Sequence, residues 1–219
     1  MTEWIIKSKN RSYLDILLLL SFLFTALLFG RAYSVKSIRY LFLVWNLFLA
    51  WVPYCLALFI EKGTVKKAPI YWLMFSVWLL FFPNAPYMLT DLIHMPDIEF
   101  GPHAHVRLLQ WVDVILITGF VCIGYWLGLE SMKKVHKTLR AKFSNKLSWV
   151  FIGVISFLSG YAIFIGRYAR LNSWDVVRPI KLIRIFLEQL SMTSIIFTIM
   201  FTCLISASYL IYYGLHSRQ

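Results

Sequence analysis

A carboxylate and an imidazole in the middle of the chain have the types and spacing that metal or acid–base chemistry needs. Asp91 and His94 are three positions apart, so on an α-helix both side chains lie on one face, which Tyr87 also shares. A carboxylate and an imidazole one turn apart can bind one divalent metal ion or pass a proton. A hydrogen bond between the two at the membrane interface explains the same spacing, and both interpretations stay open.

Asp113 is a second candidate carboxylate because it is the third residue of a long apolar segment that begins at Trp111. An ionisable side chain just inside a membrane costs free energy and marks a functional site by default. The alternative is an acid at the start of a helix, where the helix dipole stabilises the negative charge. If Asp113 joins Asp91 and His94, these oxygen and nitrogen ligands suit a divalent ion such as zinc or manganese.

Two arginines further along the chain supply the positive charge that an anionic substrate would need. Arg167 and Arg170 lie one helical turn apart, a spacing at which two guanidinium groups can bind one phosphate or carboxylate. They can equally reach up to lipid headgroups or neutralise a nearby acid. Asp175 follows them as a further candidate catalytic carboxylate, and Asn172 as a candidate substrate-binding residue.

The composition of the chain identifies the environment that must hold these residues. Of the 219 residues, 60% are hydrophobic and only 15% are charged, whereas soluble domains carry about 25% charged residues. A water-soluble fold of this length has no way to bury so much apolar surface. The net charge of +12 sits in short segments between apolar runs, which indicates the lipid bilayer surface, and not nucleic acid, as the partner.

Apolar segments long enough to cross a membrane occur six times along the chain, since a spanning helix needs about 20 apolar residues. The sequence therefore predicts an all-α, polytopic membrane helix bundle in a single domain covering 1–219. The three cysteines fall inside these segments and are predicted to be buried in the protein. The predicted spans are 14–33, 41–60, 69–89, 111–129, 149–165 and 193–213.

Two of the connections between these spans carry specific expectations. The residues 130–148 are rich in lysine and arginine and are predicted to form a basic loop on the cytoplasmic side. The residues 179–190 begin with a proline, which is favoured at the first position of a helix, and continue with apolar side chains at helical spacing. We expect a short amphipathic helix in the membrane interface, or alternatively a simple extension of the last span.

The third predicted span is interrupted by the sequence FPNAPY at 82–87. Its two prolines remove backbone donors, the first at a depth of about 21 Å from the start of the span. Non-helical backbone at that depth is stable only against protein or a water-filled cavity, so the break forms either a cavity or a packed kink. Asn84 and Tyr87 in the break, with Asn46 of the second span, are candidate substrate-binding residues. Asn46 has the alternative role of an interhelical hydrogen bond.

The distribution of basic residues orients the predicted spans. One side of the membrane receives 13 lysines and arginines and the other side 9. The side with more is cytoplasmic by the positive-inside rule. Both termini are then cytoplasmic, and the candidate site residues meet in one polar layer at the extracytoplasmic face.

Four stretches of the chain resemble a known family. They read NLFLAWVPY at 46–54, FPNAPYMLTDLIH at 82–94, WVD at 111–113 and SGYAIFIGRYARLNSWD at 159–175. Together they resemble the bacterial integral-membrane family known as domain of unknown function 1361. That family usually has an aromatic residue directly before the aspartate of the third stretch, where this chain has Val112. The resemblance implies a multi-pass protein of the bacterial inner (plasma) membrane, and it implies no activity.

Three classes of function fit these residues. The first is a membrane enzyme, a hydrolase or transferase acting at the outer leaflet on an anionic lipid or an envelope precursor. Its carboxylates and histidine would hold a metal ion or do acid–base work. The second is a small transporter or channel with the broken third helix as its site. The third is a structural or accessory membrane subunit, whose polar layer only joins the helices. The sequence indicates no oligomeric state.

Overall fold

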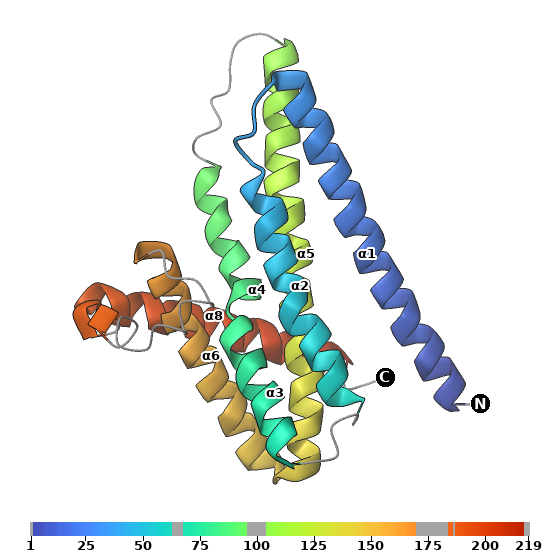
Figure 1. The fold of residues 1–219 in the computed structure, drawn as a ribbon, viewed down its shortest axis with the longest axis vertical. Helices are drawn as coiled ribbons and strands as arrows, with labels where there is room; N and C mark the ends of the chain where they lie inside the picture. Colours follow the sequence, from blue (N-terminus) through green and yellow to red (C-terminus); the bar gives the residue numbers. More distant parts are fainter. Residues whose placement is uncertain (1, 63–67, 96–103, 170–183, 186, 217–219) are drawn as a thin grey trace. The chain divides into compact units, whose positions relative to one another are not determined.

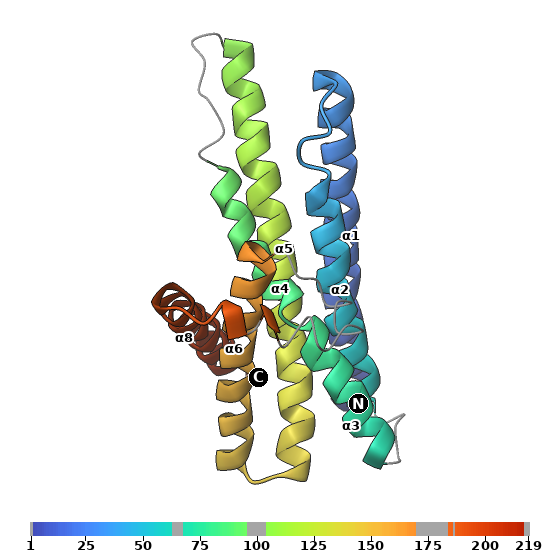
Figure 2. The ribbon, with the colours of Figure 1, turned by 60° about the vertical axis from the view of Figure 1, so that its left-hand side comes forward.

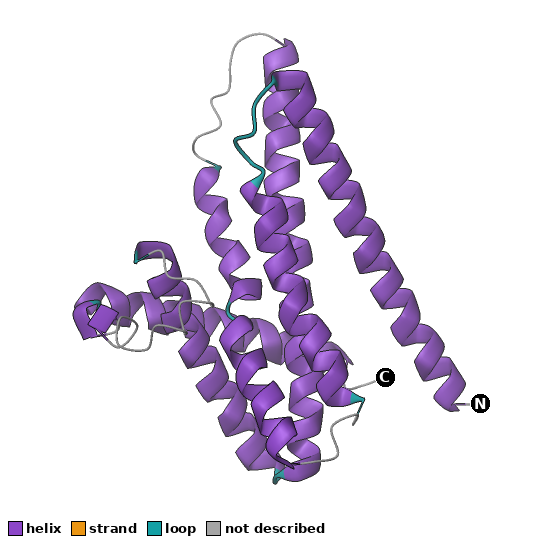
Figure 3. Ribbon diagram, viewed as in Figure 1, coloured by secondary structure: helices purple, strands orange, loops and turns teal. Residues whose placement is uncertain are grey.

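The computed structural model describes residues 2–62, 68–95, 104–169, 184–185 and 187–216. Helix dominates this part of the chain, and none of its residues forms a β-strand (Figure 3). The all-α prediction is confirmed. The helices, drawn in Figure 1, are α1 (Thr2–Val35), α2 (Phe42–Glu61), α3 (Ala68–Phe81), α4 (Asn84–Tyr87), the 3-10 helix η1 (Met88–His94), α5 (Ala104–Lys142), α6 (Asn145–Tyr168) and α8 (Met192–His216).

Six helical segments are long and apolar enough to cross a membrane, which confirms the predicted number of spans. Length and composition together make each a candidate, because about 20 apolar residues cover the hydrocarbon core. The six segments are Tyr13–Val35, Phe42–Glu61, Ala68–His94, Leu108–Lys142, Asn145–Tyr168 and Met192–His216.

The chain divides into two compact units, which are described separately below. Unit 1 consists of Met1–Phe48 and Met88–Gly124, and unit 2 of Leu49–Tyr87 and Tyr125–Gln219. The single domain over 1–219 therefore stays a prediction.

The predicted break in the third span is present. Helix α3 ends at Phe81, because the residue before a proline avoids helical backbone angles and Pro83 has no amide proton to donate. The side chain of Asn84 donates to the carbonyl of Phe81 at 2.8 Å, and the amide of Tyr87 donates to the carbonyl of Pro83 at 2.9 Å. These two hydrogen bonds satisfy carbonyls that the break would otherwise leave unpaired.

The break is packed against helix α5 within unit 2. Phe82 and Ala85 are fully buried there. A Cβ atom added at Gly128 of α5 would lie 3.0 Å from the Cβ of Ala85, so the glycine permits the close approach. The described geometry favours the packed kink over the cavity, the two alternatives that the sequence leaves open.

The predicted basic loop at 130–148 is wrong for most of its length, because helix α5 continues to Lys142. Its buried side chains explain why: Met132, Val135 and Leu139 follow helical spacing and lie in the core of unit 2. Only a short turn separates α5 from α6, where the hydroxyl of Ser144 accepts from the amide of Leu147 at 3.3 Å. Figure 2 shows the resulting antiparallel pair formed by the end of α5 and α6.

Helix α8 packs along α6 within unit 2, and the contacts run in opposite directions along the two helices. Phe197 near the start of α8 contacts Phe164 near the end of α6, with ring centroids 5.5 Å apart. Tyr209 near the end of α8 contacts Trp149 near the start of α6 at 6.0 Å. Small residues allow the approach between these points, because a Cβ atom at Gly160 would lie 2.7 Å from a backbone carbonyl of α8.

The structure also bears on the predictions for the cysteines and for residues 179–190. Cys55, Cys122 and Cys203 are exposed on the protein surface, so their predicted burial is wrong, since an apolar residue in a spanning helix can face lipid as readily as protein. Half of the predicted amphipathic helix at 179–190 lies outside the described residues. At its described end Arg184 forms an exposed ion pair with Glu188 at 3.2 Å.

Candidate functional site

Asp113, the acid predicted to lie just inside the membrane, is held by an arginine of helix α1. The guanidinium of Arg31 donates from Nε to Oδ1 at 2.7 Å and from Nη2 to Oδ2 at 2.8 Å. The two side chains are only 10% and 11% exposed. This parallel pair of bonds is the strongest geometry between these two groups, and it engages both carboxylate oxygens.

An aromatic ring covers the same arginine in unit 1. The guanidinium carbon of Arg31 lies 4.9 Å from the ring centroid of Tyr40, a residue that is buried. Such a cation–π contact stabilises the charge by about 0.5 kcal/mol or more. Arg31 therefore joins α1, α5 and the segment between α1 and α2.

Asp91 and Asn46, both predicted as site residues, are brought together in unit 1. The Nδ2 of Asn46 donates to Oδ2 of Asp91 at 2.8 Å, and Asp91 is 1% exposed. Asp91 and His94 lie on the 3-10 helix η1, where residues three apart lie directly in line. The ring of His94 packs against Phe42 with centroids 4.9 Å apart. Tyr87 was predicted to share the face of Asp91 and His94, but it ends the preceding helix α4. Met88, three residues before Asp91, lies on that face of η1 instead.

The other predicted site residues lie in unit 2 or outside the described residues. Asn84 and Tyr87 belong to unit 2 and are half-buried in the break. Arg167 is half-buried in the last turn of α6, also in unit 2. Arg170, Asn172 and Asp175 lie outside the described residues.

The described residues do not fit a metal centre. Among them, no three His, Cys, Asp or Glu side chains are grouped closely enough to hold an ion. Of the predicted ligands Asp91, His94 and Asp113, the last already has both oxygens bonded to Arg31. The assignment of these residues to catalysis stays a prediction, and the function proposed below uses no metal ion.

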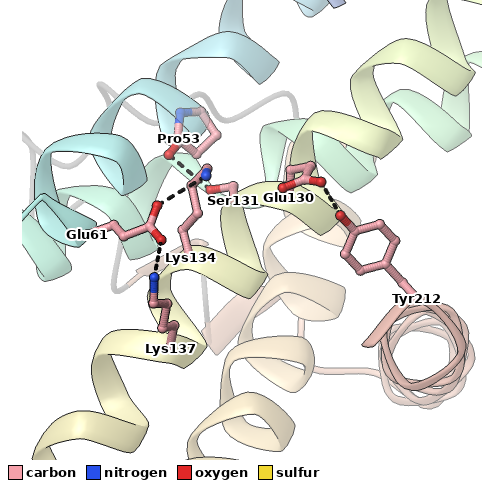
Figure 4. A network of polar contacts seen from close by, with 7 residues as sticks. All are labelled: Pro53, Glu61, Glu130, Ser131, Lys134, Lys137 and Tyr212. Atoms are coloured by element: carbon pink, nitrogen blue, oxygen red, sulfur yellow. Dashed lines mark hydrogen bonds and ion pairs between the residues drawn. The ribbon is translucent and has the colours of Figure 1, made fainter. Parts of the chain in front are cut away.

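A second polar cluster, in unit 2, was missed by the sequence analysis. Glu61 at the end of α2 accepts from Lys134 at 3.1 Å and from Lys137 at 3.0 Å, both on α5 (Figure 4). Lys134 is buried, whereas the side chain of Lys137 is 74% exposed. One carboxylate thus neutralises a buried lysine and holds a surface lysine against α2.

Ser131 connects three helices beside this ion pair. Its hydroxyl donates to the carbonyl of Pro53 at 3.0 Å and accepts from the indole of Trp78 at 2.8 Å. All three helices, α2, α3 and α5, therefore meet at one buried hydroxyl. Figure 4 shows the bond between Ser131 and Pro53. Polar bonds of this kind hold helices together where lipid supplies no hydrophobic driving force.

Three tyrosines of helix α8 bond to ionisable residues of α5. Tyr212 donates to the buried Glu130, Tyr213 accepts from Arg140, and Tyr209 bonds to Nδ1 of His136 at 2.8 Å. His136 is fully buried and packs against the rings of both Tyr209 and Trp149. The sequence does carry a signal for the polar contacts of α5 in unit 2, because Glu130, Lys134 and Lys137 repeat at helical spacing.

The buried ionisable side chains and six apolar helices define the class of this protein: an all-helical, multi-pass membrane protein. The chain belongs to the family described as protein of unknown function, DUF1361, whose model matches residues 45–207. This match confirms the predicted family. No curated protein and no solved structure matches the chain.

Proposed function

We propose that this chain is a structural or accessory membrane protein, in which the ionisable side chains hold helices together. The observation that carries this proposal is the pairing of Asp113 with Arg31. Asp113 is the acid whose position most suggested chemistry, yet both of its oxygens bond to a helix far away in the sequence. A carboxylate held in this way is poorly suited to act as a base or a ligand.

Three further acids, two of them buried and Glu61 partly buried, support the same proposal. Asp91 bonds to Asn46, Glu61 to Lys134, and Glu130 to Tyr212, in each case between two elements of the chain. Leaving a buried charge unpaired costs about 3–5 kcal/mol, so each partner is needed for the fold. The four acids thus have structural roles that require no substrate.

The proposed location is the inner (plasma) membrane of a bacterium, with both termini in the cytoplasm. The larger number of basic residues on the side of the termini supports this orientation. Asp91, Asp113 and Arg31 then belong to the extracytoplasmic ends of their helices. The basic end of α5 then lies on the cytoplasmic side.

A charge swap tests the structural role. Arg31→Asp and Asp113→Arg each place two like charges together, whereas the double variant restores an opposite pair. We expect each single variant to lose most of its folded, monodisperse protein in size-exclusion chromatography, and the swap to recover a large part of it. A swap that folds no better than the singles contradicts the proposal.

The accessory role needs a separate measurement. We expect wild type to copurify, after cross-linking in intact membranes, with one partner at constant stoichiometry. The swap should retain this partner and the single variants should lose it. A wild-type chain that purifies alone under these conditions contradicts the accessory role. The charge swap still tests the structural role of the ion pair independently of this result.

A second candidate, a metal-independent enzyme at the outer leaflet, is favoured by the bond between Asn46 and Asp91, which brings two predicted site residues together. Its test is the lipid and envelope-precursor profile of cells that carry wild type, no chain, or Asp91→Asn. If the protein is an enzyme, cells that carry Asp91→Asn should accumulate the same precursor as cells without the chain, while the variant protein keeps the melting temperature of wild type. A wild-type lipid and precursor profile in the Asp91→Asn cells contradicts the enzyme hypothesis.

A further inference from the structure

His136 is a titratable residue buried where three helices of unit 2 meet. It belongs to α5 and is 0% exposed. Its Nδ1 lies 2.8 Å from the hydroxyl of Tyr209 on α8, and its ring centroid lies 4.5 Å from that of Trp149 on α6. Histidine is the side chain whose charge normally changes near neutral pH. The charge of His136 therefore bears on how these helices stay together.

The hydrogen bonds of His136 fit a neutral ring with its proton on Nε2. In this form the hydroxyl of Tyr209 donates to Nδ1. Nε2 is buried and has no hydrogen-bond partner among the described residues, but the rings of His136 and Trp149 meet at 71°. That angle permits a weak N–H···π contact. With the proton on Nδ1 instead, the hydroxyl hydrogen of Tyr209 has no described acceptor.

The groups around His136 do not compensate a positive charge. Tyr209 and Tyr213 of α8 contact the ring, and α6 contributes the uncharged Trp149. Arg140, one turn further along α5, is close enough to repel a charge on the ring. None of the described residues that act on His136 is an acid.

The acids of the same unit are bonded to other side chains. Glu61 accepts from Lys134 and Lys137, and Glu130 accepts from Tyr212. A proton on His136 would therefore place an unpaired charge in a buried position, next to a second positive charge. Such a charge costs more free energy than a neutral polar group, so the closed junction requires the neutral ring.

We propose that His136, Tyr209 and Trp149 form an acid-sensitive lock, which holds α8 on α5 only while His136 is neutral. We call these three residues the His136 lock. When α8 separates from α5, the ring meets water and can take up a proton. The protonated ring returns to its buried position only at a cost, so acid favours the separated state. This inference does not rest on the function proposed above.

The size of the effect follows from linkage between proton binding and opening. A histidine in water has a pKa of about 6.5. At pH 5 protonation then favours the open state by a factor of about 30, and at pH 7.5 by almost nothing. We therefore expect the equilibrium constant for opening of the end of α8 to rise about thirtyfold between pH 7.5 and pH 5.

Hydrogen–deuterium exchange of the full-length protein in a mild detergent measures this opening. Exchange rates of peptides from 205–216 are divided by the intrinsic rate at each pH, so that the ratio reports the opening equilibrium. His136→Gln is the test variant, because its amide oxygen can still accept from Tyr209 but the side chain does not titrate. His216→Gln is the matched control, since it removes a half-buried histidine at the end of the same helix pair but outside the His136 lock.

We expect the thirtyfold rise in wild type and in His216→Gln, and a rise of less than about threefold in His136→Gln. Titration of Glu61 and Glu130 affects all three proteins alike and cancels in the comparison. A rise in His136→Gln that equals that of wild type overturns the proposal. The same conclusion follows if His216→Gln removes the rise as completely as His136→Gln does.

Arg140→Gln keeps the test decisive if His136→Gln does not fold. Without the neighbouring positive charge, a protonated His136 costs less in the closed state, so acid should open α8 less than in wild type. Lys146→Gln removes the same charge from an exposed position of α6 and should leave the acid effect unchanged. Equal acid effects in Arg140→Gln and Lys146→Gln overturn the proposal.

Discussion

Arg31 and Asp113, 82 residues apart in the chain, face each other through two parallel hydrogen bonds of 2.7 and 2.8 Å. Because both side chains are nearly buried, we expect Arg31→Gln and Asp113→Asn each to lower the free energy of unfolding by about 3–5 kcal/mol. The double variant should lose less than the sum of the two. Denaturant unfolding in a mild detergent measures all three.

The exposed ion pair between Arg184 and Glu188 is the control for this cycle. Exposed pairs one helical turn apart contribute only about 0.3–0.5 kcal/mol, so the same cycle there should show almost no coupling. Strictly additive losses at Arg31 and Asp113 would contradict the described pair.

Two glycines of helix α6 should respond in opposite directions to the same substitution. A Cβ atom at Gly160 would lie 2.7 Å from the carbonyl of Thr198, whereas one at Gly153 would meet nothing within 4 Å. Gly160→Ala should therefore destabilise the contact between α6 and α8 by about 1–3 kcal/mol. Gly153→Ala should be neutral or stabilise the helix by up to about 1 kcal/mol. Thermal unfolding compares them, and equal effects would show that α8 does not pack on α6 as described.

The hydroxyl of Ser131 should contribute to stability mainly by accepting the hydrogen bond from the indole of Trp78. Ser131→Ala leaves the N–H of Trp78 buried without this acceptor, at a cost of about 1–3 kcal/mol. Trp78→Phe together with Ser131→Ala should cost little more than Trp78→Phe alone, because the phenyl ring needs no acceptor. Ser34→Ala serves as the control, since that exposed hydroxyl bonds only to its own helix at Gly30. Fully additive losses at Ser131 and Trp78 would contradict the described hydrogen bond.

The orientation can be tested with fusions at four positions. A reporter that is active only outside the cytoplasm should be active after residue 100 or 178 and inactive after residue 65 or 144. Position 144 lies in the short turn between α5 and α6, so a fusion there leaves α5 intact. The reverse pattern of activity would place both termini outside.

Sequence patterns predicted the helices of this protein better than the partners of its side chains. The apolar segments and the proline-rich break are local signals, and the structure contains both. The extension of α5 was missed because lysines lower its average hydropathy. Its helical spacing of Met132, Val135 and Leu139 was nevertheless visible in the sequence.

The candidate site shows where local patterns stop being informative. Asp113 was singled out because its own position is unusual, but its partner Arg31 lies on another helix and no spacing rule connects them. An interhelical hydrogen bond was likewise only one of the two roles considered for Asn46, and the sequence did not identify Asp91 as its partner. Pairings over such distances depend on which faces of the helices meet, and in a membrane both faces of a helix are apolar.

The outward-facing thiols have a practical consequence for labelling experiments. Cys55, Cys122 and Cys203 lie on the protein surface within apolar spans, where hydrocarbon surrounds them in a bilayer. A thiol reacts with maleimides only as the thiolate, and a charged reagent stays in the water. The natural chain should therefore react little with a charged maleimide. A single cysteine introduced in an aqueous turn, such as at Ser144, should be labelled selectively without removal of the three natural cysteines.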